Sequence, residues 1–430
     1  MASLSSTRIA ACVFLACAVP AHADLQAQAT NVTQWHGVFH APYSGANSLD
    51  PHGRTEETTD ITLYAGMSPW RGAELWINPE IDQGFGLSNT LGLAGFASGE
   101  AYKIGANQPY VRIPRLFLRQ VVALGGEPEK VQGGANQLEG TRTANNVTLT
   151  IGKFSVVDVF DVNTYAHDPR VDFLNWSIID SGAFDYAADA WGFTYGAAAE
   201  WTRDRWTWRG GLFQLSAVPN AKIVRPDLRQ FMLVAEIEHR HDWRGHGGKV
   251  KLLAFANRAP MARYQDALRQ SRVTGGAPDV AAVRRRAWRP GAALNAEQEI
   301  ASDIGAFVRA SVNDGSKEAY EFTEINRSLA AGLSIKGERW NRPADTVGVA
   351  FVANGLSRRA RDYFAAGGLG ILIGDGALDY RSERIAETYY SWKAYRALAV
   401  TFDYQRVVNP AYNADRGPVN VYAVRAHIEF

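Results

Sequence analysis

The C-terminal segment alternates apolar and polar side chains one by one, and this pattern constrains the fold more than any other feature. Its apolar members are Tyr422, Val424, Ala426, Ile428 and Phe430, and most of the residues between them are charged or titratable. Successive side chains of a β-strand point to opposite faces. The segment therefore reads as a strand with one apolar face and one wet face.

The same period of two recurs along most of the chain. It predicts strands at 27–39, 59–67, 73–81, 111–124, 146–153, 192–202, 206–216, 229–240, 248–257, 303–312, 318–325, 327–336, 346–354, 384–393, 397–407 and 420–430. Short and long connections alternate between these segments, except for a long link at 125–145 and a tight one at 326. That regularity indicates an antiparallel sheet whose short turns all lie at one end.

Hydrophobic residues make up 46% of the chain, yet no run of about 20 apolar residues could span a membrane as a helix. A soluble antiparallel sandwich would also alternate. Aromatic residues at strand ends, strands of about ten residues and a final aromatic residue favour a membrane barrel instead. We therefore expect an all-β fold: a transmembrane antiparallel β-barrel of about 16 strands, with long extracellular loops and one loop folded inward as a constriction.

The N-terminal 23 residues read as a cleaved signal peptide. Arg8 precedes an apolar stretch that is too short for a membrane span, and Ala21 and Ala23 supply the small residues of a cleavage site. The barrel domain is then 24–430, and both cysteines are lost with the peptide. The balance of 45 Lys+Arg against 44 Asp+Glu gives no basic surplus for nucleic acid.

Candidate pore-lining residues lie on the wet faces of two neighbouring strands. On the strand 111–124, Arg115 and Arg119 flank Phe117. The preceding strand carries Glu74, Trp76, Asn78 and Glu80. Arginines facing carboxylates across a lumen would let a neutral, polyhydroxylated solute exchange its water shell for protein groups. The alternative is a set of salt bridges that only stiffens the wall.

The long segment 154–191 mixes acidic and aromatic residues, among them Asp168, Asp172 and Trp176. Flat rings can cover the apolar face of a sugar, and carboxylates can accept hydrogen bonds from its hydroxyls. We expect this loop to line the pore. Its aromatic residues have the alternative role of holding the loop against the barrel wall.

Catalytic, metal and cofactor sites are not predicted. Glu74 and Glu80 are six residues apart on one strand, which separates their backbones by about 20 Å and is too far for a paired acid and base. An outer-membrane hydrolase acting on lipid or glycan remains the alternative function, with His167 beside Asp168 as its lead. A soluble exported sugar-binding protein is a third.

Three motifs resemble the carbohydrate-selective OprB-type porins, and the resemblance covers essentially the whole mature chain. They are GAELWINPEIDQGFGLSNT at 72–90, HDPR at 167–170 followed by FLNW at 173–176, and NPAYNADRGP at 409–418. The resemblance implies a sixteen-stranded outer-membrane barrel that admits sugars such as glucose. It also implies a narrow eyelet of arginine and acidic residues, for which the candidates are Arg115, Arg119, Glu74 and Glu80.

Together these observations predict a passive channel of the Gram-negative outer membrane. Its partners would be small neutral saccharides and outer-membrane lipid, with no nucleic acid, no cofactor and no enzymatic activity. The sequence leaves monomer and homo-oligomer open, as well as the preferred sugar.

Overall fold

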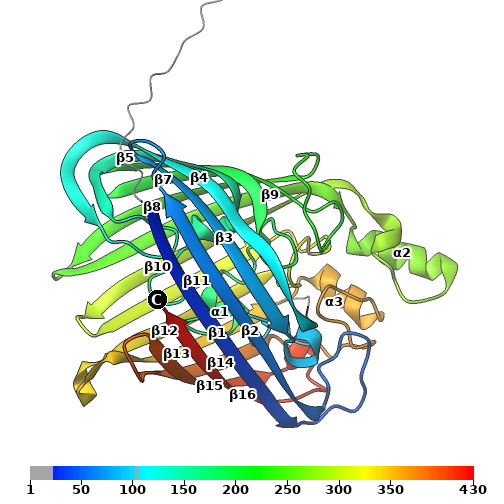
Figure 1. Cartoon of the computed structure of the whole chain (residues 1–430). Helices are drawn as coiled ribbons and strands as arrows, with labels where there is room; N and C mark the ends of the chain where they lie inside the picture. The colour runs from blue at the N-terminus through cyan, green and yellow to red at the C-terminus, as the bar shows by residue number, and fades with distance from the viewer. Residues whose placement is uncertain (1–22, 102–104) are drawn as a thin grey trace, which may run out of the picture.

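A computed structural model describes residues 23–101 and 105–430 as one closed antiparallel β-barrel, in which each strand pairs with its neighbours in the sequence and β1 pairs with β16 (Figure 1). The strands are β1 (Ala23–Val38), β2 (His52–Met67), β3 (Ala73–Gly84), β4 (Ala106–Val131), β5 (Gly140–Phe154), β6 (Thr194–Arg203), β7 (Trp206–Gln214), β8 (Phe231–Trp243), β9 (His246–Met261), β10 (Arg285–Ala301), β11 (Ile304–Asn313), β12 (Arg327–Gly337), β13 (Arg342–Gly355), β14 (Glu383–Lys393), β15 (Leu398–Val408) and β16 (Val419–Glu429). This confirms the predicted fold class. The predicted signal peptide lies almost wholly outside the described residues.

Short turns gather at one end of the barrel and long connections at the other. The long connections are 39–51, 85–105, 155–193, 215–230, 262–284, 314–326, 356–382 and 409–418. They carry the helices α1 (Trp176–Ile179), α2 (Tyr264–Thr274) and α3 (Arg358–Ala365). The end of β16 and the start of β1 both lie at the short-turn end, where the Phe430 amide donates to the Ala27 carbonyl at 2.9 Å.

Two strand predictions were wrong, and their errors cancelled in the total. Residues 318–325 form no strand, because they belong to the long connection 314–326, which is buried inside the barrel. The strand β10 was missed, since alanines stand on both of its faces and Pro290 lies on its outward face, so that its alternation is weak. With β10 in place, long and short connections alternate without the tight link predicted at 326.

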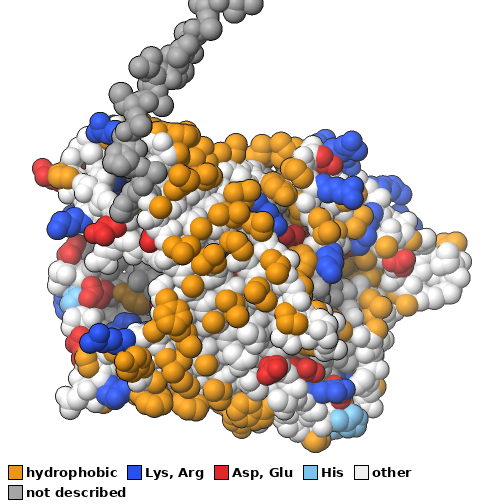
Figure 2. Space-filling model, viewed as in Figure 1, with side chains coloured by type: hydrophobic (Ala, Val, Ile, Leu, Met, Phe, Trp, Pro, Cys, Tyr) orange, Lys and Arg blue, Asp and Glu red, His pale blue; other side chains and the backbone are white. Residues whose placement is uncertain are grey.

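The outer surface of the barrel is apolar between two charged ends. On β2 and β3, the strands that face the viewer, the exposed residues Ile61, Leu63, Leu75 and Ile77 point outward. Figure 2 shows apolar side chains spread over the middle of this face, with charged side chains gathered toward both ends of the barrel. No helix within the described part of the chain is long and apolar enough to cross a membrane. The apolar belt suits a barrel surrounded by lipid.

The connection 155–193 lies inside the barrel, and the wall holds it through its backbone. The Glu387 carboxylate of β14 accepts the amides of Leu174 and Asn175 at 2.5 and 3.1 Å. Three strands away in the sheet, Arg309 of β11 donates to the carbonyl of Ile178 at 2.8 Å. Charged side chains that face inward thus satisfy the backbone groups of a buried loop.

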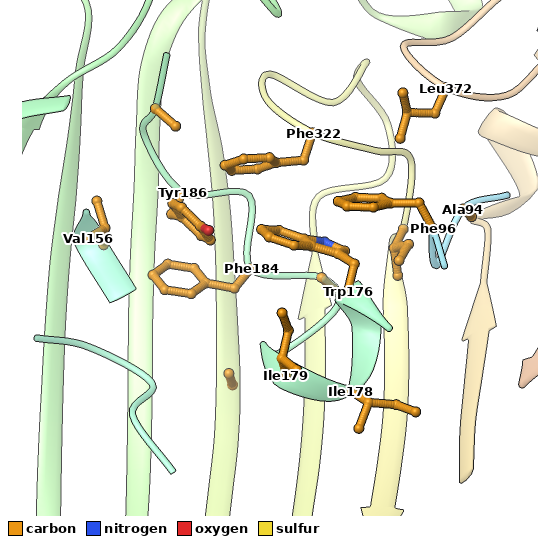
Figure 3. Close-up of a cluster of buried hydrophobic side chains, with 14 of the residues drawn as sticks. Ala94, Phe96, Val156, Trp176, Ile178, Ile179, Phe184, Tyr186, Phe322 and Leu372 are labelled. Carbon is orange, nitrogen blue, oxygen red and sulfur yellow. The ribbon is translucent and has the colours of Figure 1, made fainter. Parts of the chain in front are cut away.

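An apolar cluster packs the same loop against its neighbours (Figure 3). Trp176 stacks on Phe96 from the connection 85–105, with ring centroids 5.0 Å apart, and its ring lies 4.6 Å from that of Phe322. Tyr186 lies 4.5 Å from Phe322 on the far side of the cluster. Three long connections therefore share one core inside the barrel and leave only part of the lumen open.

Candidate functional site

Two cavities occupy the part of the lumen that the inner loops leave open, and they meet at two side chains. The larger cavity, about 390 Å³, lies between the connection 155–193 and the wall made by β4 and β5. The smaller one, about 20 Å³, lies against β2 and β3. Glu100 and Arg170 line both cavities. The junction of the two cavities is therefore a constriction formed by two loops, and we call these two side chains the Arg170–Glu100 junction.

Arg170 is projected by a turn that its own acidic residues hold. The Asp172 carboxylate accepts the amides of His167 and Asp168 at 3.0 and 3.1 Å, and Asp168 accepts the amide of Arg170 at 2.9 Å. The barrel wall supports the turn from outside, because Arg425 of β16 donates to the carbonyls of Pro169 and Asp172. The hydrogen bonds within and around the HDPR motif thus fix the position from which the Arg170 side chain extends into the lumen.

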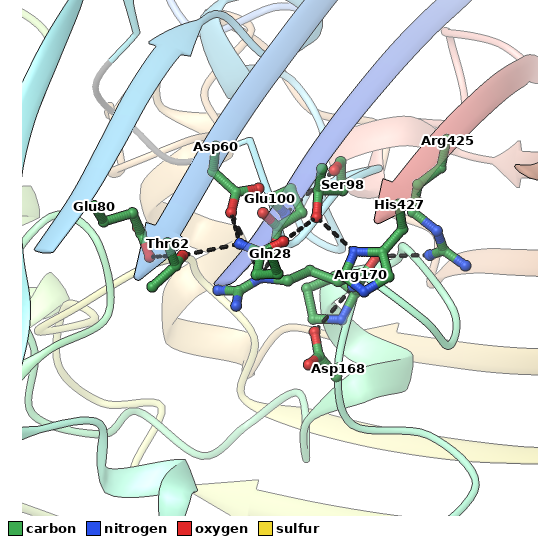
Figure 4. A network of polar contacts seen from close by, with 12 residues as sticks. Gln28, Asp60, Thr62, Glu80, Ser98, Glu100, Asp168, Arg170, Arg425 and His427 are labelled. Carbon is green, nitrogen blue, oxygen red and sulfur yellow. Dashed lines mark hydrogen bonds and ion pairs between the residues drawn. The ribbon is translucent and has the colours of Figure 1, made fainter. Parts of the chain in front are cut away.

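The Arg170 guanidinium reaches three oxygen groups, two of which, Asp60 and Glu100, are labelled in Figure 4. It donates to the Tyr64 hydroxyl at 2.9 Å, its Nε lies 3.4 Å from Glu100, and Asp60 lies 3.9 Å away. Burial raises the pKa of Glu100 well above its usual range and Asp60 adds to the rise, while Arg170 opposes it. The Glu100 carboxyl therefore keeps its proton to a higher pH than an ordinary glutamate does.

Hydrogen-bonded polar side chains of the barrel wall lie beside the Arg170–Glu100 junction (Figure 4). Gln28 donates to Asp60 and, at 2.8 Å, to the Thr62 hydroxyl, and Thr62 in turn donates to Glu80 at 2.7 Å. Thr30 lies 2.9 Å from Nδ1 of His427. Inward side chains of β1, β2, β3 and β16 thus form one connected polar surface beside the junction.

A ladder of three arginines runs along the inner face of β4. Arg112 pairs with both Glu80 and Asp82 of β3. Arg115 makes a bidentate pair with Asp158 at 2.8 and 2.7 Å. Burial would raise the pKa of Asp158, but the charge and hydrogen bonds of Arg115 hold it below its usual value.

The third arginine lies toward the short-turn end. Arg119 donates to Glu74 at 3.1 Å and to the carbonyl of Asn136 at 2.7 Å. Arg112 escaped prediction because a register shift between Asn78 and Glu80 changes the alternation of β4 there. Without that bulge, Arg112 and Arg115 would point to opposite faces.

The structure brings some of the predicted site residues to the cavities and not others. Arg115, Phe117, Arg119, Asp168 and Trp176 line the larger cavity, and Glu80 lines the smaller one. Glu74, Trp76, Asn78 and Asp172 line neither cavity. Trp76 is fully buried with its ring nitrogen 3.0 Å from Glu74, and Asp172 holds the HDPR turn.

Two tryptophans of the connection 155–193, Trp176 and Trp191, line the larger cavity but make different contacts. Trp176 is buried and packs against the rings of Phe96 and Phe322, so this tryptophan mainly holds the loop. Trp191 also lines the larger cavity, and its ring nitrogen donates to the Tyr110 hydroxyl at 2.8 Å. The sequence did not point to Arg170 and Glu100 as site residues, although Arg170 stands inside a recognised motif, whereas Trp191 is among the aromatic residues of the segment expected to line the pore.

The OprB model of carbohydrate-selective porins matches residues 46–430. The chain belongs to the OprB family. No curated protein matches it in sequence. The protein is therefore a carbohydrate-selective porin of the Gram-negative outer membrane, which is a channel and not an enzyme.

Solved structures share the fold of this OprB-family porin at low sequence identity. The high-pH structure of Pseudomonas putida OprB matches with a TM-score of 0.70 at 14% identity, covering 95% of this chain and 94% of that one. The outer-membrane channel DcaP of Acinetobacter baumannii matches with a TM-score of 0.51 at 11% identity, covering 95% and 97%. Both confirm the sixteen-stranded barrel.

The hydrolase alternative finds no support. His167 lies 3.8 Å from Asp180, and burial lowers the pKa of its ring. The family and the fold are those of channels. Among the residues that the structure describes, no group of His, Cys, Asp and Glu has a metal-binding arrangement.

Proposed function

We propose that this porin admits small neutral saccharides such as glucose by passive diffusion, and that they pass from one cavity to the other at the Arg170–Glu100 junction. One observation carries the proposal: the two cavities share these two side chains and meet where a charged pair from separate loops stands in the lumen. A solute that follows this route must pass between them or displace them.

The chemistry of the route suits a sugar. Guanidinium groups donate hydrogen bonds and carboxylates accept them, so a ring with several hydroxyls can replace its water shell at each step. Arg112, Arg115 and Arg170 all have carboxylate partners already, so none is an unpaired charge waiting for an ion. A neutral sugar would then cross by exchanging partners without being held tightly.

The direction of entry follows from the ends of the barrel. Outer-membrane barrels place their short turns in the periplasm and their long loops outside. With that orientation, a sugar enters among the long connections and reaches the smaller cavity beside Asp82 and Tyr110. It then passes the junction into the larger cavity and leaves at the short-turn end.

Liposome swelling tests the proposal directly. The purified porin in vesicles should pass glucose faster than a zwitterionic amino acid of similar size. Equal rates would contradict selectivity for saccharides, and no swelling with either solute would contradict the channel.

The junction itself is tested by single-channel current. Glucose should reduce the current of the unmodified porin, and Arg170→Ala should weaken that effect. The matched control is Arg339→Ala, which removes an exposed arginine paired with Asp303 in turns at the short-turn end. If both variants respond to glucose as the unmodified porin does, the sugar does not pass Arg170.

A further inference from the structure

The hairpin between β4 and β5 departs from every other connection at the short-turn end. The two strands continue well beyond the neighbouring turns, to Val131 and from Gly140, and arch away from the barrel before turning back (Figure 1). We call residues 125–131 and 140–145 the arm and residues 132–139 the tip. Other turns at this end, such as 204–205 and 244–245, are only two residues long.

Two consecutive glycines bend the arm. Gly125 and Gly126 have φ angles of 97° and 91°, a region that residues with a side chain rarely adopt. The pairing register between β4 and β5 shifts on both sides of Gly125. Such irregularities bend a strand sharply. The bend is thus built into the backbone, and it redirects the hairpin.

The tip returns to the inside of the barrel and is fastened there. The carbonyl of Asn136 accepts a hydrogen bond from the Arg119 guanidinium at 2.7 Å, and the side-chain amide of Gln137 donates one to the Glu74 carboxylate at 3.4 Å. Leu138 is buried in the apolar cluster of the inner loops. By contrast, the arm from Glu127 to Lys130 is exposed. The tip is thus held by inward side chains of β3 and β4.

The tip also closes one side of the solute's path. Ala135, Asn136 and Gln137 line the same larger cavity that Arg170 and Glu100 line. A saccharide that has passed the Arg170–Glu100 junction therefore meets the tip before it leaves the barrel.

We propose that the tip of the β4–β5 hairpin is a second size filter at the exit of the channel, seated by Arg119 and Glu74 and aimed by the Gly125–Gly126 bend. This inference rests on the proposed route through the two cavities. The junction selects at one end of the larger cavity, and the tip limits the size of the solute that leaves at the other. Arg119 and Glu74 are positioning residues for this filter.

The first test removes the bend without touching the cavity. Gly125→Val combined with Gly126→Val places β-branched residues at positive φ, which should force the arm to a different course. The matched control is Gly140→Val on the same arm, where no atom lies within 4 Å and φ is not positive. The readout is the ratio of maltose to glucose swelling rates in liposomes.

We expect the double variant to raise that ratio by about threefold or more, because the displaced tip widens the exit, while Gly140→Val leaves the ratio unchanged. A ratio in the double variant equal to that in Gly140→Val would overturn the size filter. Glucose swelling in every variant tests the channel separately, so failure of the filter and failure of the proposed route are distinguishable.

The second test fastens the tip covalently and does not depend on the bend. The mature chain is predicted to lack cysteine, so Glu74→Cys with Gln137→Cys supplies its only two thiols. A short thiol crosslinker should join them, and in the glycine double variant it should return the maltose ratio toward that of the unmodified bend. Two results would contradict the proposal: failure of the two cysteines to crosslink when the glycines are unmodified, or crosslinking in the glycine double variant that leaves its ratio of maltose to glucose swelling rates unchanged.

Discussion

Arg170 and Glu100 come from different long connections and meet inside the barrel, with Nε of the arginine 3.4 Å from the carboxylate. Each lines both cavities of the lumen. Neither residue lies on a strand, so the point where the two cavities meet is set by loops that the wall holds in place. The width of the channel at this point depends on how firmly those loops are anchored.

Removing the arginine should open this point. We expect Arg170→Ala to raise single-channel conductance about twofold, because the side chain leaves the lumen and its positive charge no longer repels cations there. The same variant should discriminate less between glucose and an amino acid of similar size. Arg339→Ala serves as the control. An unchanged conductance would mean that ions bypass the junction.

The charges around the two cavities predict which solutes are rejected. Their linings contain seven carboxylates, Asp60, Glu80, Asp82, Glu100, Asp158, Asp168 and Asp180, against three arginines, Arg115, Arg119 and Arg170. Burial raises the pKa values of Glu100 and Asp180, and with both protonated the carboxylates still outnumber the arginines. The residues that line the two cavities therefore carry a net negative charge.

We expect glucuronate to enter liposomes more slowly than glucose, by about threefold to tenfold at low salt, and glucosamine to enter at least as fast as glucose. Raising the salt concentration should reduce these differences, since the charges are then screened. Glucuronate uptake equal to that of glucose at low salt would show that these carboxylates do not face the solute.

Asp180 predicts a pH dependence of ion selectivity. Burial, helped by Asp161 and opposed by Arg309, raises its pKa to about 8. Its carboxyl is then mostly neutral at pH 7 and becomes charged by pH 9, where it adds a negative charge to the wall of the larger cavity. Reversal potentials in a KCl gradient should show stronger cation preference at pH 9 than at pH 7.

Asp180→Asn should lose that part of the change, and a variant with the full change would exclude Asp180 as its source. The same shift bears on stability. The folded protein holds this proton more tightly than the unfolded chain does, so the contribution of Asp180 to stability falls as pH rises from the ordinary aspartate range toward 8. Asp180→Asn should flatten that dependence in thermal unfolding.

Glu387 predicts how firmly the inner loop is held. Both of its oxygens accept loop amides, from Leu174 and Asn175. Glu387→Ala leaves these two buried amides without their partner, at about 1–3 kcal/mol for each group. We expect noisier open-channel current and faster trypsin cleavage after Arg170. Glu338→Ala, in an exposed turn, is the control and should show neither effect.

Phe351 tests the lipid-facing surface. Its side chain is 63% exposed on the outside of β13. Phe351→Arg should destabilise the barrel in lipid by about 2–4 kcal/mol if the residue lies near the bilayer midplane. Leu369→Arg, at an exposed position in the connection 356–382, should cost much less. Equal unfolding curves for the two variants in vesicles would contradict the placement of the apolar belt.

The sequence by itself determined the barrel, because alternation is a local property of strands that face lipid on one side and the lumen on the other. The predicted strands 397–407 and 420–430 match β15 and β16 within a residue. The same reasoning missed β10, where alanines weaken the contrast, and misread 318–325, where a buried loop happens to alternate.

Only the tertiary structure decided which side chains form the constriction. Arg112 faces the lumen because of a bulge in β4. Arg170 contacts Glu100 because two connections that are distant in the sequence pack together inside the barrel. Arg119 and Glu74 were predicted as eyelet residues, yet they hold the β4–β5 tip. Periodicity records which face of a strand a residue occupies, whereas contacts between loops depend on long-range packing that no local pattern encodes.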